Sequence, residues 1–423
     1  MQPIETAWRR NLATLWTAQV VSLLGWTLTF NFYPFFFRSI GVDDPARAAF
    51  WTGVSAWMFG LGLFVMGPIW GFLADRRGRK LNVLRATFIG GLVLLPVGFA
   101  TQIWQIVVLR LIVGMAHGLD WATNGLIAAT TPRAKLPLAF GIITTSLFAG
   151  SIFGPLLGGL VIDRWGMGVA FVVSGAAFIA GGALVWAFVH ERFERPAAPT
   201  RNPIEDIVQV ARMPGIWRLL VMLVALHSTL LLTSPVIAPL VSELHTGGND
   251  GTATGLAFMA NSIGMVVSSL ASGWLSARLG LKRVFLAGSI ATAVVYIAPF
   301  AAQNVVQFVL AFGLAGLVQG GLINALNGLI AMSAPAGKQG TVFGAAQAAI
   351  AVAVAVGPLV GGTLALWSGL RGPFALVIAS FAVVTFVAWR LLQAPRPETA
   401  TAEPEPMPAP SPVAPAPVTP RVA

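Results

Sequence analysis

The chain has 423 residues, of which 56% are hydrophobic and only 10% are charged. Because soluble domains carry about 25% charged residues, this composition excludes a water-soluble protein. The net charge of +11 does not indicate nucleic-acid binding, because the cations lie in short segments between apolar stretches. The sequence has no cysteine, which excludes disulfides and thiolate metal sites.

Twelve apolar windows follow one another along the chain, each near the length of about 20 residues that a membrane-spanning helix needs. The first is too long for the apolar region of a signal peptide and lacks an A-x-A cleavage site, so we expect an uncleaved span. We therefore predict an all-α membrane protein with twelve transmembrane helices. The windows cover residues 12–37, 51–73, 83–101, 103–131, 138–162, 167–189, 217–242, 253–275, 284–302, 305–332, 340–366 and 370–392.

The distribution of cations predicts which end of the bundle faces the cytoplasm. Most of the 26 Lys and Arg residues fall in segments on one side of the predicted spans. Cytoplasmic loops are rich in these residues, and an even number of spans leaves both termini on that same side. We expect both termini to be cytoplasmic. The exceptions are Arg38, Arg47, Arg164 and Arg371 on the other side, and Arg110 within a span.

The two halves of the chain repeat one another. The segment Gly71–Lys80, G-F-L-A-D-R-R-G-R-K, has a weaker copy that begins at Gly273. The motifs N-G-L-I-A, which begins at Asn124, and G-P-x-x-G-G, which begins at Gly154, both recur 203 residues later. Parallel repeats of this kind favour a binding site between the halves and alternating access. We expect six-helix bundles at 1–189 and 217–393, a cytoplasmic linker at 190–216 and a tail at 394–423.

The two polar segments outside the bundles are interpreted from their composition. In the linker, residues 204–212 are compatible with a short amphipathic helix on the membrane surface, and a flexible connection is an equal alternative. The Pro/Ala-rich tail has almost no large apolar residues and cannot bury a core, so we expect it to be disordered.

Three motifs resemble those of the major facilitator superfamily. Gly71–Lys80 resembles its loop signature between helices 2 and 3, and Arg110 with Gly114 resembles its helix-4 motif. The fifth span resembles the antiporter motif of the 12-helix bacterial drug–proton antiporters; that motif comprises Gly150, Gly154, Pro155, Gly158 and Gly159. The resemblance implies a transporter in the bacterial inner membrane that exports small, mostly hydrophobic compounds in exchange for protons.

The loop signature implies a conformational latch. In the superfamily, the counterpart of Asp75 lies against the cytoplasmic N-terminus of helix 11, here near Gly340, where a carboxylate is stabilised by about 0.3–2 kcal/mol. Alternatively, Asp75 only neutralises neighbouring cations. Glycine at positions 71 and 78 permits close helix approach and a tight turn. The candidate latch residues are Gly71, Asp75, Arg76, Gly78 and Arg79.

Glycine recurs every fourth residue in the fifth span, at positions 150, 154 and 158, and forms a smooth stripe on one helix face. Pro155 is expected to bend this helix. The resemblance places the motif at a close interface with the other half, where it limits leak. Plain packing of small residues is the alternative.

The fourth span carries the candidate proton-coupling residues Arg110, His117 and Asp120. With Trp121 and Asn124 they fall within about 100° of a helical wheel, so this face should meet the protein interior or an aqueous cavity. Asp120 is the one carboxylate placed well inside a predicted span. Structural alternatives are that His117 forms an interior hydrogen bond, that Arg110 anchors backbone carbonyls, and that Asp120 is the counter-ion of Arg110.

The first span departs from the drug–proton antiporters, which often carry a membrane-embedded acid there; here it offers only uncharged polar residues such as Gln19. Proton coupling therefore falls on Asp120, alone or together with His117 or His227, or is absent. The superfamily architecture lines its cavity with spans 1, 4, 7 and 10. The candidate cavity residues are Asn31, Phe35, Trp121, Asn124, His227, Asn324 and Asn327, with ordinary core packing as the alternative for the two aromatic residues.

The predicted partners are a small-molecule substrate, protons and the lipid bilayer, with no cofactor, no metal and no nucleic acid, and a monomer is sufficient. The rival within transport is a metabolite or sugar exporter, or a facilitator that needs no coupling ion. A membrane enzyme or receptor is disfavoured because the sequence has no Walker A motif, no metal-spaced cluster and no nucleophile–base pair in the spans. A channel is also disfavoured, because the sequence shows no ring of like charges.

Overall fold

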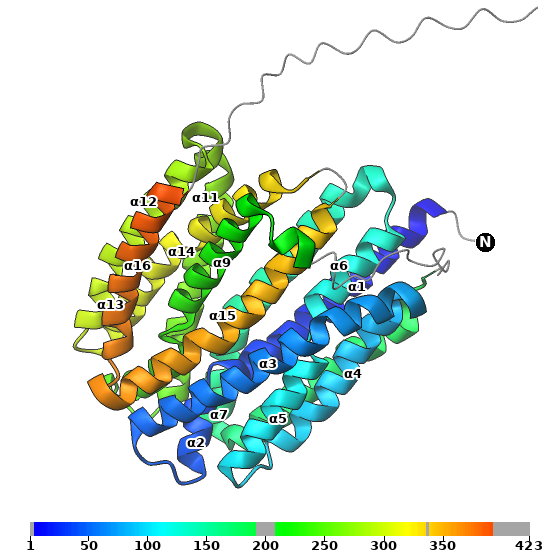
Figure 1. Cartoon of the computed structure of the whole chain (residues 1–423). Coiled ribbons are helices and arrows are strands. Elements are labelled where there is room, and N and C mark those ends of the chain that lie inside the picture. The colour runs from blue at the N-terminus through cyan, green and yellow to red at the C-terminus, as the bar shows by residue number, and fades with distance from the viewer. Residues whose placement is uncertain (1–3, 192–207, 336–337, 392–423) are drawn as a thin grey trace, which may run out of the picture.

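The computed structural model describes residues 4–191, 208–335 and 338–391, which are almost entirely helical (Figure 1). The first half comprises α1 (Ile4–Phe30), α2 (Tyr33–Ser39), α3 (Pro45–Arg77), α4 (Arg79–Val97), α5 (Ile103–Ala116), α6 (Leu119–Thr130) and α7 (Leu136–Phe188). The second half comprises α9 (Pro214–Leu231), α10 (Ser234–Leu244), α11 (Asp250–Leu279), α12 (Leu281–Val295), α13 (Ile297–Ala301), α14 (Val305–Ser333), α15 (Gln339–Ser368) and α16 (Gly372–Leu391). Most of the predicted linker and the predicted tail lie outside the described residues.

Eleven helical stretches of the described chain are long and apolar enough to cross a membrane. One of them, Arg133–Phe188, contains α7 and has 56 residues, far more than the roughly 20 that one crossing needs. Its backbone turns at Gly166, where φ is 83° and ψ is 173°, so α7 contains two spans on either side of this glycine. The prediction of twelve transmembrane helices is confirmed.

Four windows that we expected to be continuous helices, 12–37, 103–131, 217–242 and 284–302, are each divided into two helices. Proline explains two of the interruptions. Pro34 and Pro235 lie at the first turns of α2 and α10, and neither residue has the N–H that would continue the preceding helix. The interruption between α12 and α13 lies at Tyr296. The interruption between α5 and α6 lies at Gly118 and belongs to the candidate site.

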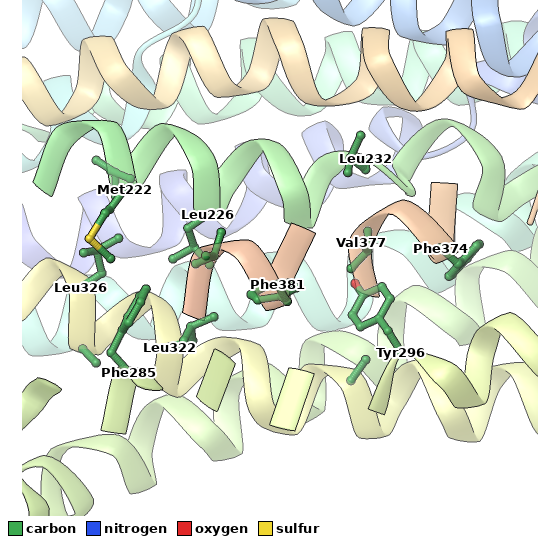
Figure 2. Packing of buried hydrophobic residues seen from close by; sticks show 14 of the residues in the cluster. Met222, Leu226, Leu232, Phe285, Tyr296, Leu322, Leu326, Phe374, Val377 and Phe381 are labelled. Atoms are coloured by element: carbon green, nitrogen blue, oxygen red, sulfur yellow. The ribbon is translucent and has the colours of Figure 1, made fainter. Parts of the chain in front are cut away.

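Each half has its own buried hydrophobic core. In the second half, Met222 and Leu226 of α9 pack in one cluster with Phe285, Leu326 and Phe381 of other helices (Figure 2). The first half forms a second cluster from α1 to α7. Two alanines pack into the core of the opposite half. Ala49 of α3 lies in the core of the second half, and Ala351 of α15 lies in the core of the first half.

The halves meet along α3 and α15, which lie side by side (Figure 1), and along α7 and α11. The two ends of the molecule are named here by their turns. The basic end contains the turns at Gly78 and Gly280, and the far end contains the turn at Gly166. The closest contacts between halves lie toward the far end; a Cβ at Gly53 in α3 would collide with the carbonyl oxygen of Pro358 in α15.

Candidate functional site

The fourth span is broken in its middle. Helix α5 ends at Ala116 and α6 begins at Leu119. Between them, His117 is extended (φ −66°, ψ 168°) and Gly118 has φ 125°, a conformation that favours glycine. The expectation of one continuous helix over 103–131 was therefore wrong, and the expected polar face is divided between two half-helices.

Neighbouring helices satisfy the backbone carbonyls that this break frees. The indole nitrogen of Trp70 in α3 donates to the carbonyl of Met115 (2.6 Å), and Nη1 of Arg85 in α4 donates to that of Ala116 (2.7 Å). The Arg85 guanidinium also lies over the Trp70 ring at 3.9 Å. Irregular backbone within a membrane protein is stable where other groups satisfy it in this way. Sequence reasoning missed both residues; the only signal was a cation at the edge of an apolar window.

Asp120 lies in the first turn of α6, just after the break. Its Oδ1 accepts a hydrogen bond from Nε2 of Gln19 in α1 (2.9 Å). Gln19 is 3% exposed, and its own oxygen has no hydrogen-bond partner. The start of a helix is its positive end and favours a carboxylate. Discontinuous transmembrane helices of this kind form the substrate and ion sites of many transporters.

His117, in the break itself, lies among aromatic rings. Its ring centroid is 4.6 Å from that of Trp26 and 5.3 Å from that of Phe59. Trp26 lies on α1 and Phe59 on α3, so the break is packed between these two helices.

Arg110 of α5 is buried, with only 2% of its surface exposed. Its guanidinium lies 4.4 Å from the ring of Tyr33, 4.6 Å from Phe59 and 5.6 Å from Phe30. Its Nε and Nη1 have no hydrogen-bond partner, so these two atoms anchor no backbone carbonyl. Within the described part of the chain, Arg110 and Asp120 do not form an ion pair.

The candidate cavity residues lie on α1–α2, α6, α9 and α14. Asn124 and Asn324 are exposed, and the other five are half-buried. Nδ2 of Asn324 is bonded to α11 through the hydroxyls of Ser269 (2.8 Å) and Ser272 (3.0 Å). His227 Nδ1 lies 3.1 Å from the carbonyl of Leu223 in its own helix. The other members of this set are Asn31, Phe35, Trp121 and Asn327.

A separate cavity of about 340 Å³ lies where the starts of α1 and α7 meet. It is lined by none of the candidate cavity residues. Its lining residues are Trp8, Arg9, Leu12, Ala13, Lys135, Leu138 and Ile142.

The loop signature forms the turn between α3 and α4. Gly78 has φ 103°, as a tight turn at this position requires. Nothing lies within 4 Å of a Cβ built at Gly71, or at Gly340, so the expected close helix approach at Gly71 is absent in this conformation. The guanidinium of Arg76 lies 4.1 Å from the Phe72 ring centroid. Asp75 lies in the last turn of α3, but its side chain lies outside the described residues, so the latch stays a prediction.

A carboxylate that the sequence did not single out organises the start of α4. Glu191 accepts hydrogen bonds from the backbone nitrogens of Arg79 (3.0 Å) and Lys80 (2.8 Å). Nη1 of Arg79 also donates to the carbonyl of Gly125 in α6 (3.3 Å). The basic turn is thus tied to the end of the fourth span and to the segment after α7.

The glycine stripe of the fifth span packs against the same half, contrary to the expectation. The positions of a Cβ at Gly150, Gly154 and Gly158 are occupied by Leu23, Thr27 and Leu28 of α1, respectively. This face is therefore an interface inside the first bundle, because α1 and α7 belong to the same half.

The neighbouring face of this motif meets the other half. A Cβ at Gly159 would collide with the carbonyl of Gly251 in α11, and one at Gly255 would collide with the carbonyl of Pro155. The contact between halves that the motif implied is thus made by Pro155 and Gly159.

Among the described residues, no group of three or more His, Cys, Asp or Glu side chains is placed to hold a metal ion.

A comparison with known families decides the classification. The model of the Major Facilitator Superfamily matches residues 15–248 and 229–422. The chain belongs to the major facilitator superfamily. It is therefore a membrane transporter with the expected twelve-helix fold, and the resemblance of the three motifs is confirmed at the level of the family.

Relatives and solved structures of this superfamily align with nearly the whole chain. Multidrug resistance protein MdtG of Salmonella arizonae is 27% identical over 93% of this chain and 98% of its own. A multi-drug resistance efflux pump PmrA homolog of Lactococcus lactis is 28% identical over 91% of this chain and 95% of its own. A POT family transporter in complex with 5-aminolevulinic acid has a TM-score of 0.73 at 12% identity, with 91% and 97% coverage. An inward-facing bacterial homolog of Spinster has a TM-score of 0.71 at 14% identity, and the alignment covers 92% of this chain and 97% of its own.

Proposed function

We propose that this protein exports small, mostly hydrophobic compounds from a bacterial cytoplasm by alternating access, in exchange for protons. The printed names of relatives such as MdtG and the PmrA homolog describe multidrug resistance and efflux, which supports drug-like substrates. The basic end would face the cytoplasm, because cytoplasmic segments are enriched in Lys and Arg. The protein would then lie in the inner membrane with both termini inside.

The observation that carries the proton-coupling proposal is the position of Asp120 at the broken fourth span. A carboxylate at this depth is costly and is by default a functional group. It begins a half-helix and accepts a hydrogen bond from Gln19. Both features stabilise its charged form, while the apolar surroundings stabilise its neutral form. Asp120 can therefore exchange a proton when the solvent that reaches it changes.

The supporting role of His117 and Arg110 is electrostatic and steric. The rings of Trp26 and Phe59 enclose His117, and the Arg110 charge is held by aromatic rings and not by Asp120. Among the described residues, no cation forms an ion pair with Asp120, which leaves its carboxylate available for a proton.

The test is substrate-induced proton flux in everted vesicles, using the compound that gives the largest effect in a sensitivity screen of a pump-deleted host. The Asp120→Asn variant keeps the side-chain shape and cannot ionise, so the flux should fall to background while membrane insertion stays normal. The matched control is Asp43→Asn, which removes an exposed carboxylate far from the break. Unchanged flux in the Asp120 variant would contradict the proposed role.

The alternative is an uncoupled facilitator. The observation that favours it is the uncharged first span, where Gln19 is the buried polar group that faces Asp120. Substrate gradients that persist after the proton gradient is collapsed would support the facilitator and exclude proton exchange.

A further inference from the structure

A carboxylate at the far end joins the two halves of the protein. Asp163 ends the first span of α7, just before the turn at Gly166. Its Oδ1 accepts a hydrogen bond from the backbone nitrogen of Gly251 (2.9 Å). Its Oδ2 accepts bonds from the backbone nitrogen (2.7 Å) and the hydroxyl (2.6 Å) of Thr252. The donors form the first turn of α11, in the other half.

Asp163 takes the place that a local cap usually occupies. The first backbone N–H groups of a helix have no partner within the helix, and the residue before the helix commonly supplies one. Asn249 precedes α11 but makes no side-chain cap. By contrast, Asp44 caps its own helix α3 through the backbone nitrogen of Ala46 (3.1 Å). The start of α11 is therefore completed by a residue of the opposite bundle.

The geometry makes this contact depend on the conformation. The bonds of Asp163 lie beside the close backbone contacts of Gly159 with Gly251 and of Pro155 with Gly255. All of these contacts join α7 to α11 toward the far end. When the bundles separate there, the hydrogen bonds between the Asp163 carboxylate and the start of α11 break, together with the glycine contacts.

We propose that Asp163 is a latch that holds the far end closed and so favours the conformation open toward the basic end. The negative carboxylate meets the positive end of the α11 dipole, and its bonds to N–H and O–H donors are charge-assisted. The latch is one-sided, because Leu366 stands 203 residues later in the repeat. It is the counterpart, at the opposite end, of the latch predicted for Asp75.

This inference rests on the alternating-access part of the proposed function and is independent of proton coupling. Each latch would stabilise one of two conformations, and a residue that contacts only one of them shifts the equilibrium toward it. Losing an interaction of a carboxylate with a helix terminus changes such an equilibrium by about two- to thirtyfold.

The test measures the separation of the halves at the far end. Because the sequence has no cysteine, spin labels can be placed at Phe99→Cys and Val306→Cys, which are 72% and 64% exposed at the far end of each half. Distances between them would be measured by double electron–electron resonance on the full chain in lipid nanodiscs. Asp163→Asn and Asp163→Ala should enlarge the population with longer distances, by about two- to thirtyfold, with the larger effect for alanine.

The matched control is Asp44→Asn. It removes the same charge from the same end of the molecule, but its cap lies within one bundle, so its distances should equal those of the parent protein. Thr252→Val should give an intermediate effect, because it removes the hydroxyl bond and keeps the two backbone bonds.

The outcomes separate the latch from the function it rests on. Distances that lengthen in other variants or with an added drug, but are unchanged by both Asp163 variants, would contradict the latch and leave alternating access intact. If no condition produces the longer distance, alternating access itself is contradicted together with the latch.

Discussion

At the scale of single residues, the most unusual feature is a buried charge that forms no ion pair with another described residue. Arg110 is 2% exposed, and aromatic rings surround its guanidinium. Cation–π contacts are worth about 0.5–2 kcal/mol each, whereas removing an ion from water costs several kcal/mol. Two of its nitrogens also lack a hydrogen-bond partner. Arg110 is therefore a poor stabilising residue, which favours a functional role over a structural one.

We therefore expect Arg110→Met to leave the thermal stability unchanged or raised while transport is lost. The apolar side chain removes the cost of burying an uncompensated charge. The control is Arg371→Met: the Arg371 guanidinium donates to the carbonyls of Phe300 and Ala302, so this variant should lower the unfolding temperature. Both are measured by thermal unfolding in detergent and by substrate export. A large stability loss in the Arg110 variant would support the structural alternative.

At the scale of elements, the break in the fourth span depends on Gly118. With φ at 125°, this residue occupies a backbone region that is strained for any residue with a Cβ. Gly118→Ala should therefore destabilise the protein by about 1–3 kcal/mol, lower its unfolding temperature and reduce export through misplacement of Asp120. Gly141→Ala is the matched control, because Gly141 is helical and has open space around its Cβ position. Equal unfolding temperatures for the two variants would mean that the break is not required.

Hydropathy predicts elements of this protein well but does not predict how they are interrupted or oriented. Twelve spans could be recognised because each has to be apolar over the thickness of a bilayer. The break before Asp120 could not, because its stability comes from Trp70 and Arg85 on two other helices. The glycine stripe was visible in the sequence, but which neighbour its face meets depends on helix rotation, which small residues on several faces leave undetermined.

At the scale of the whole molecule, adjacent residues of the fifth span serve two different interfaces. Gly158 packs on the Leu28 carbonyl of α1, inside the first bundle, and Gly159 packs on the Gly251 carbonyl of α11, across the halves. In alternating access the first interface stays intact through the cycle, and the second opens at the far end. Under the proposed alternating access, one motif would therefore combine a permanent contact with a contact that has to be released.

This arrangement predicts different consequences for two neighbouring alanine substitutions. In Gly158→Ala the added methyl group would push α7 away from α1, so the unfolding temperature should fall. In Gly159→Ala the methyl group would push the halves apart at the far end, and rigid-body separation can relieve that clash. The stability loss should then be smaller, and the spin-label pair at 99 and 306 should show more of the longer distance. Equal effects of the two variants on both measurements would contradict this division, because the face toward α1 and the face toward α11 would then behave as one interface.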